Sequence, residues 1–261
     1  MRKLLATGLT LASLSGAAVA ADLPTSKPPP AMAPLITAYN WTGFYVGLNA
    51  GGIFSNDGLI TELAPSLPND GVYNATGDVF PLKSRGSLTG GLQVGYNYEI
   101  NPFVVGLEAD INALRYKVMA PEQTTAGVIS SGGDTLGSKK ANWLSTIRLR
   151  LGFTPIDRLL IFATAGVAFS DLKYSVVDAC NTGGCGGGLA SGSTSVNTGW
   201  AAGGGLEYAF TQNWTVKGEY LYSRFAAKTF RTVDNGGPTT TPFDANHTGL
   251  HMFRVGLNYK F

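Results

Sequence analysis

Charged residues of both signs occur at alternate positions within otherwise apolar segments of the chain. The acidic ones are Glu108, Asp110, Glu207 and Glu219, and the basic ones are Arg148, Arg150, Lys217 and Arg254. Alternate positions along a β-strand project to one face, so we expect these side chains to line one polar surface. Because charges in a packed interior persist only when they are paired and hydrogen-bonded, the pattern predicts a structural ionic network. A gated ion path is the alternative interpretation.

Two catalytic interpretations of the same residue types have less support. Paired carboxylates suit acid–base catalysis, but the basic residues at matching positions favour ion pairs instead. A lipid-modifying enzyme would use a serine and a histidine, and Ser145 or Ser223 with His247 or His251 are candidates by position. Nothing in the sequence marks either serine as a nucleophile. We therefore expect no enzyme activity, no cofactor and no metal site.

The two cysteines of the chain, Cys180 and Cys185, lie in the segment Cys-Asn-Thr-Gly-Gly-Cys. One close pair in an exported protein predicts a disulfide. The ring that it would close is short, so its expected effect is to shape a loop tip and not to stabilise the whole fold. A metal site would need more ligands, and no histidine lies nearby in the sequence.

The start of the chain has the pattern of a secretory signal. Arg2 and Lys3 precede an apolar run over residues 4–14, and Ala18-Val19-Ala20 supplies small residues for cleavage. Residues 21–40 are rich in proline and predict an extended linker. We therefore divide the chain into a signal peptide (1–20), this linker (21–40) and a folded domain (41–261).

The folded domain consists of segments in which apolar residues alternate with glycine, polar or charged ones. In the last of them Phe253, Val255 and Leu257 share one face, while Arg254 and Gly256 lie on the other. Charged residues make up only 14% of the chain, against about 25% in ordinary soluble domains, which fits an apolar outer surface. Eight such segments can be recognised, at residues 43–54, 87–98, 103–114, 142–153, 159–170, 198–210, 214–223 and 248–261.

The connections between these segments alternate in length. Short ones cover residues 99–102, 154–158 and 211–213, and long ones cover about 55–86, 115–141, 171–197 and 224–247. This layout is typical of an all-β, eight-stranded antiparallel up-and-down transmembrane β-barrel with a polar interior. Unpaired backbone groups are costly in hydrocarbon, so the last strand must pair with the first. We expect irregular backbone in the long connections, and Trp41 and Trp214 in an aromatic girdle at one membrane boundary.

Three motifs resemble those of a known family. They are Asn40-Trp-Thr-Gly-Phe-Tyr-Val-Gly-Leu-Asn-Ala-Gly-Gly52, Gly205-Leu-Glu-Tyr208 and Val255-Gly-Leu-Asn-Tyr-Lys-Phe261. The chain is similar in them to the small outer-membrane β-barrel porin-family proteins of Gram-negative bacteria, which include immunogenic, opacity-type and OmpA-like barrels. The resemblance implies eight strands, surface-exposed loops and an aromatic C-terminal signal, here Tyr259 and Phe261, for the barrel-assembly machinery.

The function that we expect is a structural or surface-interaction role. The long loops would face the outside of an outer membrane, both termini would lie in the periplasm, and ion pairs would largely plug the lumen. Expected partners are outer-membrane lipid and lipopolysaccharide, the barrel-assembly machinery and an extracellular ligand of the loops. The net charge of +2 and the lack of a long basic run argue against nucleic acid. A small-solute porin gated by the lumenal charges is the alternative, and a lipid-modifying enzyme a distant one.

Overall fold

The computed structural model describes residues 38–55, 58–63, 77–83, 86–121, 123, 135–179, 189–234 and 241–261. The described residues all belong to one compact unit, Ala38–Phe261. The predicted signal peptide, residues 21–37 of the predicted linker, and both Cys180 and Cys185 lie outside the described residues, so these expectations stay predictions. In the part of the chain that is described, no helix is long and apolar enough to cross a membrane.

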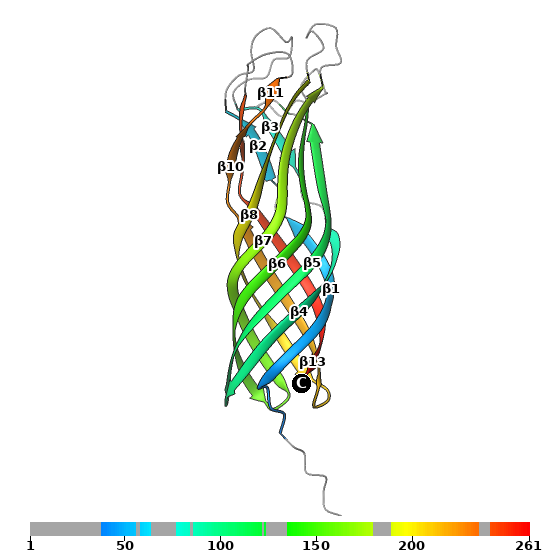
Figure 1. Ribbon diagram of the computed structural model, residues 1–261, viewed down its shortest axis with the longest axis vertical. Coiled ribbons are helices and arrows are strands. Elements are labelled where there is room, and N and C mark those ends of the chain that lie inside the picture. Colours follow the sequence, from blue (N-terminus) through cyan, green and yellow to red (C-terminus); the bar gives the residue numbers. More distant parts are fainter. Residues whose placement is uncertain are drawn as a thin grey trace, which may run out of the picture. The chain divides into compact units, whose positions relative to one another are not determined.

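Eight antiparallel strands form a closed ring (Figure 1). They are β1 (Gly43–Ser55), β4 (Ser87–Ile100), β5 (Phe103–Pro121), β6 (Thr135–Ile156), β7 (Leu159–Ala179), β8 (Leu189–Ala209), β9 (Trp214–Phe225) and β13 (Thr248–Lys260). Each strand pairs with the next along the chain, and β13 pairs with β1 from Tyr45↔Lys260 to Ser55↔Leu250. Closure leaves no open edge in the ring, as hydrogen bonding in hydrocarbon requires. The predicted barrel is therefore confirmed.

The two ends of the ring differ in their connections. Short turns at Asn101–Pro102, Asp157–Arg158 and residues 210–213 lie at the end where the chain finishes at Phe261. We call this the turn end, and the opposite end the loop end. The strand limits at the turn end match the predicted ones within a few residues. At the loop end β5, β6, β7 and β8 run well beyond the predicted limits, because their alternation continues past the apolar outer surface.

A second, smaller sheet lies at the loop end. It contains β10 (Lys228–Arg231), β12 (Pro242–Ala245), β2 (Gly58–Glu62) and β3 (Val79–Leu82) in that order, and β11 (Val233–Asp234) pairs with β8. The expectation of irregular backbone was therefore wrong in the described parts of all four long connections: β5, β6, β7 and β8 extend into the second and third, and the small sheet is built from the first and the last. Their strands pair with each other, as Phe243↔Glu62 shows, and such pairing between distant segments has no local signal.

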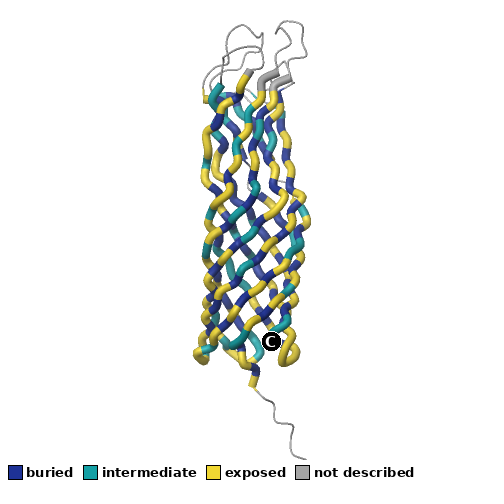
Figure 2. Tube along the Cα trace, in the orientation of Figure 1, coloured by how far each residue is buried: buried dark blue, intermediate teal, exposed yellow. Residues whose placement is uncertain are grey.

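The outer wall of the ring carries an apolar band. Exposed and buried residues alternate along most of the ring (Figure 2), and the outward ones include Leu48, Leu107, Leu149, Leu206 and Val255. At the loop side the band ends in outward-facing aromatic side chains, which we call the aromatic belt: Phe54, Trp143, Trp200, Tyr222 and His251. Beyond the belt polar and charged residues such as Lys117, Ser138 and Lys173 join the outward positions, and Met119, Leu136 and Val177 are apolar exceptions. Such a band, about 25 Å tall in known barrels, is the lipid-facing surface.

The inner wall is polar within the apolar band and becomes apolar beyond the belt. Along β5 the inward residues are Glu108, Asp110 and Asn112 within the band, and then Leu114 and Tyr116 beyond it. The inward residues Leu172, Tyr174 and Val176 of β7 continue this apolar interior, which Phe80 and Phe243 of the small sheet complete. The barrel was expected to have a polar interior, and the apolar loop-end half corrects this expectation. A strand in water must bury its apolar face inward, because no lipid covers its outside.

Candidate functional site

Strand register brings the predicted lumenal charges opposite each other. Glu108 on β5 pairs with Arg148 on β6, and Glu207 on β8 pairs with Lys217 on β9. Opposite charges at directly facing positions of paired strands attract each other at short range. The structure brings all eight predicted residues into one network, and each is 5% exposed or less: Glu108, Asp110, Arg148, Arg150, Glu207, Lys217, Glu219 and Arg254.

Arg148 lies at the centre of this network. Its Nη2 is 2.6 Å from Glu108 Oε1 and 2.8 Å from Asp110 Oδ2, and its Nη1 contacts Glu219. Nη1 also donates to Thr164 Oγ1 at 2.9 Å, and Nε donates to Thr146 Oγ1 at 2.8 Å. One guanidinium therefore holds three carboxylates, and its fixed fork of donors suits that task better than a lysine would.

Arg254 and Lys217 complete the central cluster. Arg254 donates from Nε to Glu219 Oε2 at 2.8 Å and from Nη2 to Asp110 Oδ2 at 2.9 Å. Lys217 Nζ donates to both oxygens of Glu108, at 2.8 and 2.7 Å. Three carboxylates thus meet three cations from β5, β6, β9 and β13. The balance of charge is what allows these groups to be buried together.

A second ion pair lies on the turn side of the cluster. Arg150 contacts Glu207, whose Oε1 also accepts from Asn258 Nδ2 at 2.8 Å. The Arg150 guanidinium lies over the ring of Phe162, 3.9 Å from its centroid. Tyr45 donates to Glu108 Oε2 at 2.6 Å and accepts from Arg150 Nη1 at 3.4 Å, and so joins this pair to the central cluster. With this pair the network holds four acidic and four basic side chains.

Aromatic side chains pack together at the turn end of the lumen. Trp41 is 1% exposed, its Nε1 donates to the carbonyl of Asp157 at 3.2 Å, and its backbone N–H donates to Glu99 Oε2 at 2.8 Å. Tyr39 packs edge-on against it, with 4.8 Å between the ring centroids. Burial, reinforced by the negative charge of Glu207, raises the pKa of Tyr39, which keeps the phenol neutral. We call Tyr39, Trp41, Leu160 and Phe162 the turn-end plug.

The plug corrects one prediction about the aromatic girdle. Trp41 does not lie at the lipid boundary, because it precedes β1 and folds under the ring. Trp214 does face outward, is 38% exposed and packs against Tyr259 with ring centroids 5.1 Å apart. Lys260 lies at the rim, with Nζ 4.5 Å from the centroid of the Tyr39 ring.

The apolar core described above occupies the loop end of the interior. Immediately beyond the ions its inward residues are Ile53, Leu144, Leu221 and Met252, each 1% exposed or less. Leu221 interrupts a run of polar inward residues on β9, and its position in this core explains the interruption. Sequence reasoning missed this layer. The signal for it is the switch of apolar residues from odd to even positions, as from Phe169 to Leu172 on β7.

The serines and histidines considered for catalysis are not assembled into a site. Ser223 is fully buried and faces inward, away from the outer wall that carries His251. Ser145 donates to the backbone carbonyl of Asp110 at 2.7 Å. His251 is on the outer wall, with Nδ1 2.7 Å from the hydroxyl of Tyr220, and stacks on Phe54. Within the described residues, no cluster of His, Cys, Asp or Glu could hold a metal ion.

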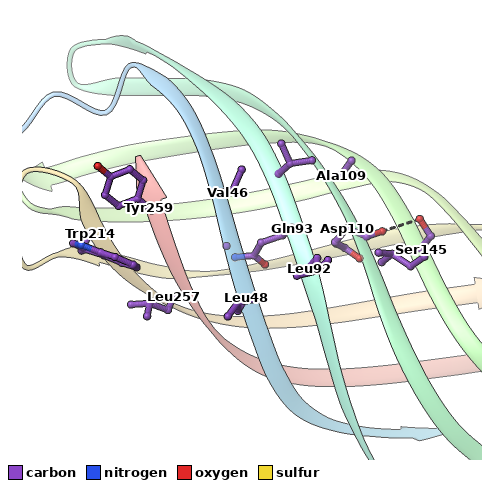
Figure 3. A pocket seen from close by; sticks show the side chains of 13 residues that line it. Val46, Leu48, Leu92, Gln93, Ala109, Asp110, Ser145, Trp214, Leu257 and Tyr259 are labelled. Carbon is purple, nitrogen blue, oxygen red and sulfur yellow. Dashed lines mark hydrogen bonds between the residues drawn. The ribbon is translucent and has the colours of Figure 1, made fainter. Parts of the chain in front are cut away.

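A hollow of about 650 Å³ lies on the outer wall and not in the lumen (Figure 3). Aliphatic side chains of β1, β4, β5 and β13 line it, among them Val46, Leu48, Leu92 and Leu257, and Trp214 and Tyr259 lie at one end. The small residues Gly47 and Ala109 also line it. Because it opens within the apolar band, its natural filling is hydrocarbon.

Comparison with known proteins agrees with this architecture. Residues 7–261 match the family described as outer membrane protein beta-barrel domain, and the chain belongs to that family. The chain is 33% identical over 257 residues to a 31 kDa outer-membrane immunogenic protein of Brucella melitensis, with 96% of each chain covered. It is 25% identical to a 22 kDa outer membrane protein of Rhizobium leguminosarum, covering 88% of this chain and 82% of that one.

Among solved structures, the chain resembles the outer membrane protein OprG of Pseudomonas aeruginosa. That likeness has a TM-score of 0.48 and 14% identity, covering 85% of this chain and 98% of the other. The family and its named relatives place the protein in the outer membrane of a Gram-negative bacterium. The resemblance found in the sequence is thereby confirmed.

Proposed function

We propose that this protein is a sealed outer-membrane barrel with a structural or surface-interaction role. The observation that carries the proposal is the filling of the lumen in three successive layers. These are the turn-end plug, the ionic network and the loop-end apolar core. An eight-stranded barrel has an interior that side chains can just fill, and here the fill continues beyond the membrane band.

We call the strand segments beyond the aromatic belt, together with the small sheet of β2, β3, β10 and β12, the loop-end extension. We propose that this extension contacts other molecules. In barrels of this kind the short turns lie in the periplasm and the long connections outside the cell. The extension has an apolar core of its own, so it can present a defined outer surface instead of separate loops. Two relatives are named as outer-membrane immunogenic proteins, which supports exposure at the cell surface.

A small-solute porin gated by the lumenal charges is the other candidate, because the barrel has charges of both signs at its centre. Liposome swelling separates the two. Vesicles with the folded full-length protein should shrink in a solution of a small sugar and fail to re-swell, as protein-free vesicles do. A general porin in a parallel preparation supplies the positive control. Re-swelling at a rate that rises with the amount of protein would overturn the sealed barrel in favour of the porin.

A further inference from the structure

Three lysines form a row across adjacent strands just beyond the aromatic belt. Lys117 on β5 pairs directly with Lys140 on β6, and Lys140 pairs directly with Lys173 on β7. All three side chains are exposed, and the buried inward residues on either side of each show that they point away from the core. We call Lys117, Lys140 and Lys173 the lysine row.

A fourth ammonium group adjoins the row. Ser195 on β8 pairs with Lys173, and its carbonyl accepts a hydrogen bond of 3.0 Å from Lys228 Nζ. Arg115 is exposed on the outward face of β5, two positions from Lys117. The positive charge therefore extends across four neighbouring strands.

Within the described residues, none of the three lysines of the row forms an ion pair. The nearest outward carboxylate on these strands, Asp171, accepts from the backbone N–H groups of Asn142 and Trp143 at 2.7 and 3.1 Å, and from the Asn142 amide. Like charges at directly facing positions of paired strands are about 5 Å apart at Cβ and destabilise the sheet. Such an arrangement needs an anion, and an anion that bridges neighbouring strands would remove the repulsion.

The place of the row in the fold indicates the source of that anion. Trp143 of the aromatic belt is three residues from Lys140 on the same strand, with its ring on the outward face. Tryptophan at the end of an apolar band marks the level of the lipid headgroups. Lysine stems can lie along such a surface while the ammonium reaches the polar layer. The row is thus at the height of headgroup phosphates at the loop end.

We propose that the lysine row binds the phosphate groups of the outer-leaflet glycolipid, lipopolysaccharide, and so fixes a lipid molecule against β5, β6 and β7. The inference rests on the loop end facing outward, as in the proposed function, but not on a sealed lumen. A protein that let solutes through could still bind lipid here. The lipid-binding proposal can therefore be contradicted while the sealed-lumen proposal holds, and the reverse is also true.

The test uses the purified full-length protein in non-ionic detergent and native mass spectrometry. The probes are bisphosphorylated lipid A and the same lipid with both phosphates removed. We expect the wild type to bind the phosphorylated form about a hundredfold more tightly at low salt, since one lysine near an anionic lipid contributes about fivefold. Lys117→Gln, Lys140→Gln and Lys173→Gln combined should abolish the preference. Equal binding of the two lipids by the wild type would overturn the proposal.

Two further variants separate lipid binding from a merely structural role. Arg224→Gln removes one outward charge beyond the belt on β9, away from the row, and should leave the preference within about twofold of the wild type. Lys140→Glu places a carboxylate between two lysines, so it should leave the folded barrel at least as stable while losing most of the phosphate preference. Retained preference in Lys140→Glu would contradict the inference. So would displacement of lipid A by heparin at matched charge, which would assign the row to acidic polysaccharide.

Discussion

Glu108 and Arg148 face each other from paired positions of β5 and β6, with 2.6 Å between Glu108 Oε1 and Arg148 Nη2 and neither side chain more than 1% exposed. The same carboxylate also accepts from Lys217 and from Tyr45. Removing Glu108 would leave Arg148 and Lys217, which are both fully buried, short of a counter-charge. A buried pair that loses one partner costs more than its net contribution when intact.

Glu108→Gln should therefore lower the free energy of unfolding by about 3–5 kcal/mol. Urea unfolding of the refolded protein in detergent micelles, followed by tryptophan fluorescence, measures the change. Asp157→Asn is the matched control, because Asp157 is exposed at the turn end and contributes only its backbone carbonyl to Trp41. Equal midpoints for both variants would show that the network does not stabilise the barrel.

Leu149→Arg tests which surface faces lipid. Leu149 is 64% exposed on the outer wall in the middle of the apolar band, and a charge there should cost about 2–4 kcal/mol. Leu136→Arg is the control on the same strand, because Leu136 is on the outer wall of the extension beyond the belt, where the cost should be about 0–1 kcal/mol. The unfolding free energy in phospholipid vesicles gives both numbers. A larger loss at position 136 would invert the assignment of the membrane boundary.

Leu172→Ala tests the loop-end core. Leu172 is fully buried on β7 beyond the belt, and truncation of such a side chain costs about 2–5 kcal/mol. Because this core belongs to the extension, we expect faster proteolysis at the loop end, while the gel shift between unheated and boiled samples persists. Val177→Ala, on the outer wall of the same strand, should behave like the wild type. Loss of the gel shift in Leu172→Ala would mean that the extension and the membrane ring fold as one unit.

Deletion of residues 251–261 should prevent assembly altogether. These residues supply most of β13, which pairs with both β1 and β9, so their loss opens the ring and exposes two edges. The heat-dependent gel shift in outer-membrane fractions reports assembly. Phe261→Ala separates closure from the predicted C-terminal signal, because Phe261 is 73% exposed and follows the last paired residue. A gel shift in the deletion variant would contradict closure through β13.

Much of the membrane ring could be predicted from the sequence, because a period of two is a local signal. Residues such as Glu108 and Arg148 interrupt apolar runs at alternate positions, so their common face follows from strand geometry alone. Their contacts also need strand tilt and register, which single segments do not contain. Trp41 was misplaced because its pattern is that of a strand start, whereas its burial depends on tertiary contacts with Asp157 and Glu99, which are distant in the sequence.

The sequence contains a local signal for the loop-end core, but this core was not predicted. On β5 the apolar residues change from odd positions, ending at Ala113, to even positions beginning at Leu114. That change marks the passage of a strand from lipid into water. The small sheet could not be predicted from the sequence, because β2 and β12 are short and lie far apart in the chain. Pairing between such distant segments is decided by tertiary contacts and not by local pattern.

Single-channel recording in a planar bilayer tests the sealed lumen most directly. The wild type, Arg254→Ala and Glu108→Ala would be measured side by side after refolding. We expect the wild type to be silent, because three layers of side chains fill the interior. We expect both variants to be silent too, because each leaves the turn-end plug and the loop-end core in place. Steady channels in the wild type, whose conductance or ion preference changes in the two variants, would contradict the sealed barrel and make the central charges a gate.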